Sequence, residues 1–283
     1  MIETINDGRV PLDSLYDKYS RLELIQEEIY RQNEETNGRK IEMPILAFRS
    51  LKKGKSLWLI AGIHGEEPAG VNAVYRNIDL INKYAQAFPV VLIPCANPKG
   101  YRKDWRYPDR EEMVLEDPVP SVGSSDHIVL NGSDKPRWPV PTCPEAEALN
   151  RFMLRTIGDY PPFITMDLHE DESNVYVYSH GKLGKNDPVA INALDIARDC
   201  GAKIQFSGET LFHEPIRNGI VEGSRDGSIS DFFSSRRIYV NGEIVPGPCA
   251  RSVVVVETPQ DLDLERRVEI HSRVIKSLGR FMS

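Results

Sequence analysis

Short apolar runs alternate with amphipathic stretches along most of this 283-residue chain. The apolar runs are typical of buried strands, and the amphipathic stretches repeat their apolar residues at helical spacing. The pattern predicts strands at 43–48, 57–61, 88–94, 163–168, 175–178 and 253–256, and helices at 14–32, 68–84, 144–157, 188–200 and 262–281. Residues 102–144 and 205–252 show little periodicity and are expected to be irregular.

Strands that alternate with helices favour an α/β fold. We expect a single domain built on a twisted, mixed and mostly parallel sheet with helices on both faces. No linker, composition break or internal repeat divides the sequence, so one domain over residues 1–283 is expected. In this interpretation residues 1–50 supply a helix and a strand that precede the core, and residues 51–283 form the core.

The composition is that of an ordinary globular protein, with 40% hydrophobic and 27% charged residues. Lys and Arg number 35 against 42 Asp and Glu, a formal net charge of -7, so neither nucleic acid nor a membrane is expected as a partner. The first thirty residues hold no apolar signal segment, and the four cysteines lack CxxC spacing. We therefore expect a cytoplasmic protein with reduced thiols.

Metal-binding residue types follow three of the predicted strands. His64 and Glu67 follow one strand, at the corner that leads into a helix, while His169 follows a second and Glu257 a third. Parallel strands bring their carboxyl ends to the same edge of a sheet, so these side chains are expected to converge. Two histidines and a carboxylate are the ligands of hydrolytic zinc sites that leave one position open. The pattern predicts one zinc ion bound by His64, Glu67 and His169.

Glu257 is the predicted general base. A carboxylate at the end of an apolar strand is costly to bury without a partner, and a metal-bound water would provide one. The ordinary alternative is a surface glutamate just beyond its strand, with solvated charges at His64 and Glu67. The coincidence of these side chains at strand ends favours a functional role. The other histidines are expected to be bystanders (His127, His180 and His213) or a surface residue of the last helix (His271).

Six motifs occur in order along the chain. They are His64-Gly65-Glu66-Glu67, Asn97-Pro98-Lys99-Gly100-Tyr101, Asp104-Trp105-Arg106, Asp167-Leu168-His169, Gly227-Ser228-Ile229 with Asp231, and Val256-Glu257-Thr258-Pro259. Together they resemble the landmarks of the zinc carboxypeptidase family, of the carboxypeptidase A type, over residues 57–281. The resemblance implies a zinc carboxypeptidase-like fold of the phosphorylase/hydrolase-like kind.

The resemblance also implies residue roles. Its H-x-x-E motif selects Glu67, not Glu66, as the zinc ligand beside His64 and His169. Glu257 would deprotonate the zinc-bound water, and Arg106 would stabilise the oxyanion that forms on the substrate. A second metal ion is left open by the acidic run at 170–172, for which a solvated loop is the alternative.

The segments expected to bind substrate depart from the family pattern. Ser228 and Asp231 match its specificity loop. Where the family has an Asn-Arg pair that clamps the substrate carboxylate, this chain has Asn131 followed by glycine, and Arg137 is the candidate replacement. The tyrosine expected shortly before Gly227 is missing. Metal-dependent hydrolysis is therefore better supported than strict C-terminal specificity.

The predicted function is a zinc metallocarboxypeptidase that cleaves a peptide or amide bond. The succinylglutamate desuccinylase/aspartoacylase type is a second reading, with an N-acyl amino acid as substrate, because it is similar at the zinc motif. It ranks second because that type carries further strands after its catalytic glutamate, whereas 26 residues follow Glu257 here. A third reading is a zinc-binding homologue that has lost catalysis, against which the complete residue set argues.

Overall fold

The computed structural model of the chain describes residues 5–36, 38–108, 130, 134–136, 143–171, 174–210, 213–222 and 227–282. The strands are β1 (Ile25–Thr36), β2 (Arg39–Arg49), β3 (Ser56–Ala61), β4 (Val90–Ile93), β5 (Pro162–Asp171), β6 (Tyr176–Ser179), β7 (Ser207–Glu209), β8 (Pro215–Arg217), β9 (Ile220–Glu222), β10 (Arg237–Val240), β11 (Glu243–Pro246) and β12 (Ser252–Pro259). The α-helices are α1 (Leu12–Tyr19), α2 (Pro68–Arg76), α3 (Ile78–Ala87), α4 (Pro98–Lys103), α5 (Pro144–Thr156), α6 (Pro188–Asp199), α7 (Ile229–Ser234) and α8 (Leu264–Ser277), with 3-10 turns at Gly184–Asn186 and Leu278–Phe281.

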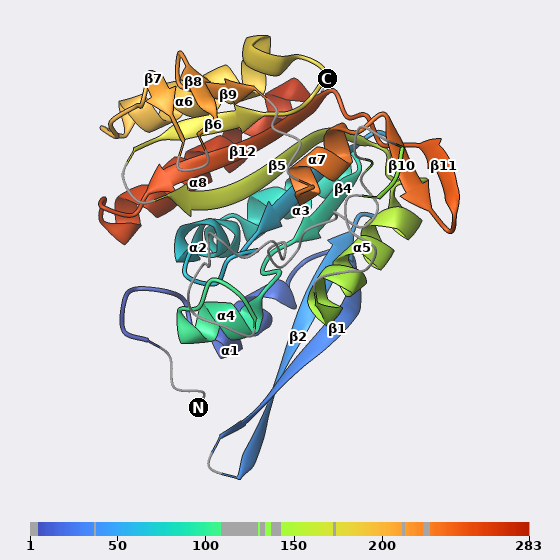
Figure 1. The fold of residues 1–283 in the computed structure, drawn as a ribbon. Coiled ribbons are helices and arrows are strands. Elements are labelled where there is room, and N and C mark those ends of the chain that lie inside the picture. Colours follow the sequence, from blue (N-terminus) through green and yellow to red (C-terminus); the bar gives the residue numbers. More distant parts are fainter. Residues whose placement is uncertain are drawn as a thin grey trace.

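Ten of these strands form one twisted sheet in the order β1-β2-β4-β3-β5-β12-β6-β9-β8-β7 (Figure 1). Its centre is parallel, because β4, β3, β5 and β12 run in the same direction, and antiparallel pairs flank this centre. Strand β3 is buried along its whole length, as expected for a parallel strand covered on both faces. The parallel centre brings the ends of β3, β5 and β12 to one edge of the sheet.

Helices cover both faces of the sheet. Apolar residues of α1, α2, α3, α6 and α8 pack on one face. On the other face α5 and α7 pack over the indole of Trp58, whose ring lies 4.8 Å from that of Phe233. The predicted α/β class, with a mixed sheet between two helical layers, is confirmed.

Three of the sequence-based predictions differ from the structure. The helix predicted at 14–32 ends at Tyr19, and residues 25–36 instead pair with β2, since edge pairing outweighs their weak helical spacing. The helix predicted at 68–84 breaks at Asn77, whose side-chain amide donates to the Ala73 carbonyl at 2.8 Å. Residues 205–252 contain short strands and α7, which are too brief to show periodicity. Most of residues 102–144 lie outside the described residues.

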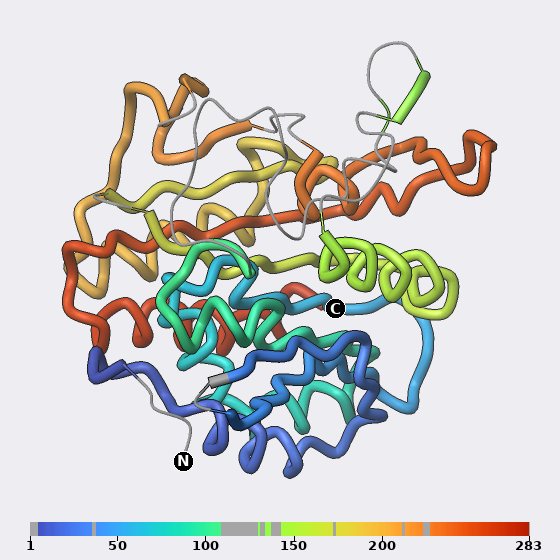
Figure 2. Tube along the Cα trace, turned by 60° about the horizontal axis from the view of Figure 1, so that its bottom comes forward, coloured from blue at the N-terminus to red at the C-terminus, as the bar shows by residue number. Residues whose placement is uncertain are grey.

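The N-terminal segment packs against the rest of the chain along much of its length, for example through Arg9, whose Nη1 donates to the Tyr101 carbonyl. Strands β1 and β2 extend the main sheet through the pairing of β2 with β4. The residues before α1 run beside the beginning of α8, where Gly8 approaches Leu264 (Figure 2). In the described part of the chain, no helix combines the length and the apolar character needed to cross a lipid bilayer.

Candidate active site

The corner after β3 is fixed by close backbone packing. A Cβ atom on Gly65 would lie 2.0 Å from the carbonyl carbon of Gly100, so only glycine fits. The Gly65 N–H donates to the Trp105 carbonyl at 3.1 Å, which ties the corner to the segment after α4. The turn thereby places His64 and Glu67 at the sheet edge, just before α2 begins at Pro68.

The three predicted ligands converge at this edge. Glu67 bridges the two histidines, with its Oε1 2.7 Å from His64 Nδ1 and its Oε2 2.8 Å from His169 Nδ1. One ligand-type atom from each residue lies within 4.8 Å of the others, and the two imidazole centroids are 4.9 Å apart. All three side chains are buried, Glu67 almost completely. This geometry suits a cation that binds two imidazole nitrogens and a carboxylate.

Mutual charge governs the protonation of the three residues. Burial alone would raise the pKa of Glu67, but the two neighbouring histidines hold it well below its usual value. Burial lowers the pKa of His64 to about 4, helped by the positive charge of Arg106. For His169 burial is outweighed by Asp167 and Glu67, which raise its pKa well above the usual value. The carboxylate therefore carries a stable negative charge between the two imidazoles.

Further groups hold the ligands in place. Asp167 lies two residues before His169 on β5, so both side chains face the same side of the sheet. Asp167 Oδ2 is 3.2 Å from His169 Nε2, the nitrogen that points away from Glu67. The Glu170 N–H donates to Glu67 Oε2 at 3.2 Å. A carboxylate on the far nitrogen of a histidine is the usual way to orient a metal ligand.

Arg106 lies at the mouth of the group. Its Nη1 is 2.8 Å from Glu66 Oε1 and 3.2 Å from Glu67 Oε1. Burial and the charge of Glu67 raise the pKa of Glu66 to about 7. The guanidinium is thus held beside the ligand carboxylate by a second glutamate.

Glu257 lies across from His169. The two residues pair in the register of β12 with β5, and Tyr176 of β6 lies on the other side of Glu257. Burial raises the pKa of Glu257 to about 8, and the negative charges of Glu67 and Asp171 act in the same direction. The side chain keeps contact with solvent, since its exposure is intermediate. A carboxyl group with this pKa can gain or lose a proton near neutral pH.

Comparisons with known proteins agree with this architecture. The family model of the succinylglutamate desuccinylase/aspartoacylase catalytic domain matches residues 53–113. A comparison with functionally curated proteins finds no match. A candidate metallopeptidase from Shewanella amazonensis superposes with a TM-score of 0.71 at 19% identity, over 96% of this chain and 91% of that one.

Two further solved structures are metallo-carboxypeptidases. The one from Burkholderia cenocepacia has a TM-score of 0.55 at 12% identity, over 95% of this chain and 67% of that one. The one from Pseudomonas aeruginosa was solved in complex with (2-guanidinoethylmercapto)succinic acid. It has a TM-score of 0.54 at 15% identity, over 95% of this chain and 67% of that one. The chain has a zinc carboxypeptidase-like fold. The family model and these structures support the zinc carboxypeptidase-related family that the motifs predict.

Within this zinc carboxypeptidase-like fold, the residues predicted to bind substrate have other observed contacts. Ser228 caps the N-terminus of α7 by accepting from the Asp231 N–H at 3.2 Å. Asp231 Oδ2 accepts from the Gly227 N–H at 3.2 Å, which completes a capping arrangement. Asn131 and Arg137 lie outside the described residues.

The sequence analysis did not predict the roles of several residues that support the site. Asn97 caps α4, and its amide also donates to the Arg106 carbonyl at 3.3 Å. Its position before a proline is a helix-start signal that could have identified it. Buried Gln32 accepts from the Lys99 N–H at 2.8 Å, and nothing in its sequence context predicts this. The surface position expected for His271 is wrong, because this side chain is fully buried.

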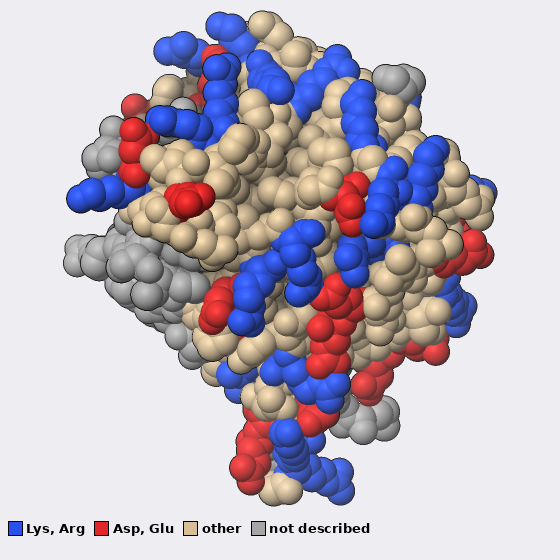
Figure 3. Space-filling view, turned by 90° about the vertical axis from the view of Figure 1, so that its right-hand side faces the viewer, with Lys and Arg blue, Asp and Glu red and all other residues tan. Residues whose placement is uncertain are grey.

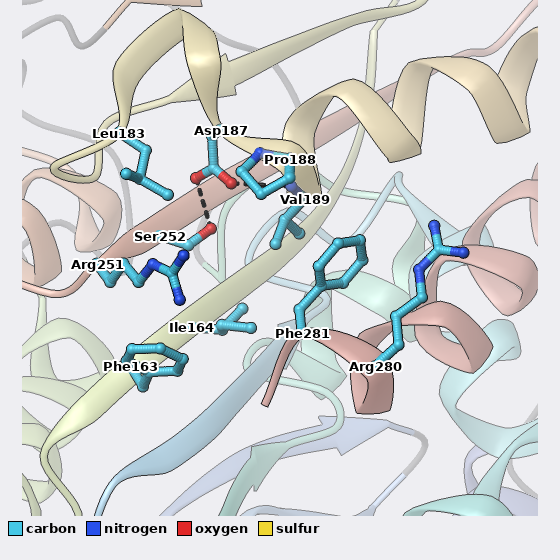
Figure 4. Close-up of a pocket in the computed structure, with 10 residues that line it drawn as sticks. All are labelled: Phe163, Ile164, Leu183, Asp187, Pro188, Val189, Arg251, Ser252, Arg280 and Phe281. Carbon is cyan, nitrogen blue, oxygen red and sulfur yellow. Dashed lines mark hydrogen bonds between the residues drawn. The ribbon is translucent and has the colours of Figure 1, made fainter. Parts of the chain in front are cut away.

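A separate pocket lies at the opposite ends of the strands (Figure 4). Phe163 at the beginning of β5 and Arg251 just before β12 line it, together with Arg280 and Phe281 of the C-terminal turn. Asp187 on its wall is satisfied by the Ser252 hydroxyl at 2.6 Å and by the N-terminus of α6. This pocket holds none of the predicted catalytic residues. On the side of the molecule that Figure 3 shows, Lys and Arg side chains are interspersed with Asp and Glu.

Proposed function

We propose that the protein is a zinc-dependent hydrolase that cleaves a peptide or amide bond, as a metallocarboxypeptidase. The observation that carries this proposal is the convergence of His64, Glu67 and His169 directly beside Glu257. A metal-ligand set and a carboxylate tuned for proton transfer are the two parts that metal-assisted amide hydrolysis requires.

The donor set fits one zinc ion. Two imidazole nitrogens and one carboxylate are a catalytic zinc set with an open fourth position. His64 and His169 both present Nδ1 to Glu67, and Asp167 lies against the remaining nitrogen of His169. A bound zinc ion would act as a Lewis acid and lower the pKa of a water in the open position to about 7.

The chain's own residues would carry out the proton transfer and charge stabilisation. Glu257 would accept a proton from the attacking water and pass it to the leaving amine, a task suited to its raised pKa. Arg106 would donate to the substrate oxygen on which negative charge develops. We also propose that Asn131, Arg137, Ser228 and Asp231 contribute to substrate binding, as the family resemblance implies.

A second candidate is an N-acyl-amino-acid amidohydrolase. It is favoured by the match of residues 53–113 to the succinylglutamate desuccinylase/aspartoacylase catalytic domain, a segment that contains His64, Glu67 and Arg106. The two candidates share the same metal chemistry and differ in the group on the acyl side of the bond.

A substrate panel with zinc-loaded protein tests the proposal. Peptides with a free carboxyl terminus, the same peptides amidated, and N-acetyl and N-succinyl amino acids are compared, with Glu257→Gln as the inactive control. Release of the last residue from free peptides alone supports the carboxypeptidase. Hydrolysis of acyl amino acids alone supports the second candidate. Bound zinc with no turnover of either class contradicts both.

A further inference from the structure

Helix α8 directs two buried polar side chains at the back of the metal-ligand group. Arg267 and His271 are four residues apart, so they lie on the same side of the helix. The Arg267 side chain is 12% exposed and His271 is fully buried. Helix α8 lies against α2, the helix that begins directly after Glu67 (Figure 1).

Arg267 reaches the ligands through Glu170. Its Nη1 is 2.6 Å from Glu170 Oε2, and Glu170 Oε1 accepts from the Ala69 N–H at 3.0 Å. The backbone N–H of the same glutamate donates to Glu67 Oε2. One ion pair therefore links α8 to the segment that carries Glu67 and to the strand that carries His169.

Glu170 also provides the side-chain cap that the N-terminus of α2 does not receive from its own N-cap residue. The N-cap of α2 is Glu67, whose side chain makes no cap hydrogen bond. The Glu170 carboxyl group fills that position from a different strand, because it accepts from the Ala69 N–H in the first turn of the helix. This use of Glu170 turns it toward α2 and α8, away from the role in a second metal site that the acidic run had left open.

His271 reaches the ligands through Thr258. Its Nε2 is 3.0 Å from Thr258 Oγ1, and that hydroxyl is 3.5 Å from the His169 carbonyl oxygen. A ring protonated at Nε2 donates to the hydroxyl and frees the hydroxyl proton for the His169 carbonyl. Thr258 adjoins Glu257, so this second link touches both a ligand and the proposed base.

Packing alone does not account for these groups. Apolar residues of α8, such as Val268, Val274 and Ile275, already fill the core beneath it. A buried ion pair usually stabilises a fold no more than apolar residues of similar volume. What an ion pair adds is a fixed geometry. Here it fixes the positions of the two segments that carry Glu67 and His169.

We infer that Arg267 and His271 are positioning residues through which the C-terminal helix fixes the metal ligands and the base. The inference rests on the proposed function, because it assigns α8 a role in that same site. Each residue acts through another group, Arg267 through Glu170 and His271 through Thr258. Removal of either link therefore changes the arrangement of the ligands while the ligands themselves remain.

The test compares Arg267→Met with Arg76→Met. Arg76 Nη2 pairs with Glu265 Oε2 at 2.6 Å, so it joins the same two helices, but at an exposed place that touches no ligand. We expect Arg267→Met to weaken zinc binding by about 10- to 100-fold in competition with a chelator. Arg76→Met is expected to match the wild type within about twofold, as an exposed ion pair contributes little.

Two further variants and a second measurement separate positioning from stability. Arg267→Lys retains the charge, and Thr258→Val retains the shape while removing the hydroxyl, so both preserve the core if Arg267→Met does not fold. The d–d absorption spectrum of cobalt-substituted protein reports ligand geometry, and it should change in Arg267→Met and Thr258→Val.

The outcomes are distinct. Variants that lose thermal stability but retain the wild-type zinc affinity and cobalt spectrum overturn the inference, and hydrolysis by the wild type then leaves the proposed function intact. A wild-type protein that binds no zinc overturns the proposed function, and this inference with it.

Discussion

Glu257 lies directly opposite His169 in the parallel pairing of β12 with β5. Two residues 88 positions apart in sequence thus become lateral neighbours, one a proposed metal ligand and the other the proposed base. The spacing of strands in a sheet, about 4.8 Å, sets their separation, so no flexible loop intervenes. The sheet register itself therefore aligns the proposed proton acceptor with a proposed metal ligand.

Replacement of the base is expected to separate metal binding from turnover. Glu257→Gln preserves the volume of the side chain but removes its ability to accept a proton. We expect one zinc ion per chain, measured by elemental analysis, and a fall in kcat of about 10²- to 10⁴-fold. A variant with a near-normal rate would exclude Glu257 from the mechanism.

Replacement of Arg106 is expected to lower the rate of turnover more than it weakens metal binding. Arg106→Met should lower kcat by about 10²- to 10³-fold, because one donor to the oxyanion is removed. Zinc affinity should change little. Arg102→Met is the matched control, since Arg102 pairs with Glu34 and not with the ligand group. Equal effects of the two substitutions on kcat would assign Arg106 a structural role.

The backbone corner at Gly65 is expected to tolerate no side chain. In Gly65→Ala the new methyl group would meet backbone atoms of Gly100, which cannot move as a flexible side chain can. We expect a loss of about 1–3 kcal/mol or more in the free energy of unfolding, measured with denaturant. Gly158→Ala is the control, because nothing lies within 4 Å of its Cβ position. Similar stabilities for both variants would contradict the close approach.

The pH dependence of stability is expected to reveal the burial of His271. Burial lowers its pKa to about 3 in the folded protein from an ordinary value near 6.5. Between these values the unfolded chain binds a proton that the folded chain does not, so stability falls as pH decreases. His271→Gln should reduce this slope by about 1.4 kcal/mol per pH unit between pH 4 and 6.

The measurement is made on zinc-free protein. The quantity compared is the difference in the free energy of unfolding between His271→Gln and the wild type at each pH. His64 also has a lowered pKa and titrates in the same range, but it contributes equally to both proteins and cancels. Parallel stability curves for the two proteins would show that His271 is accessible to protonation in the fold.

The central strands and the convergence of His64, Glu67 and His169 were predictable because local signals specify them. Strand β3 reads as an uninterrupted apolar run, and His64 and Glu67 follow it at the corner. The ends of parallel strands meet at one edge by geometry alone, which is why His169 and Glu257 were assigned to the same site. The capping contacts of Ser228 have a local signal as well, because Ser228 and Asp231 have the spacing of a capping box at a helix start.

The supporting groups were harder to predict because their partners lie on distant elements. His271 in fact lies on the apolar stripe of α8, at helical spacing from Val268 and Ile275, and this signal was available. The sequence gives no sign that Arg267 meets Glu170, since that pairing depends on how α8 packs against α2 and β5. Gln32 is similar, because β1 forms only by pairing with β2.

Metal-dependent hydrolysis is the central claim, and titration of metal-free protein with zinc tests it most directly. The substrate is one found in the panel of free peptides and acyl amino acids, and wild type is compared with His169→Ala. We predict negligible hydrolysis without metal, full activity of the wild type at one equivalent of zinc, and no recovery by His169→Ala. Undiminished hydrolysis by metal-free wild type, or equal zinc activation of His169→Ala, would contradict the account.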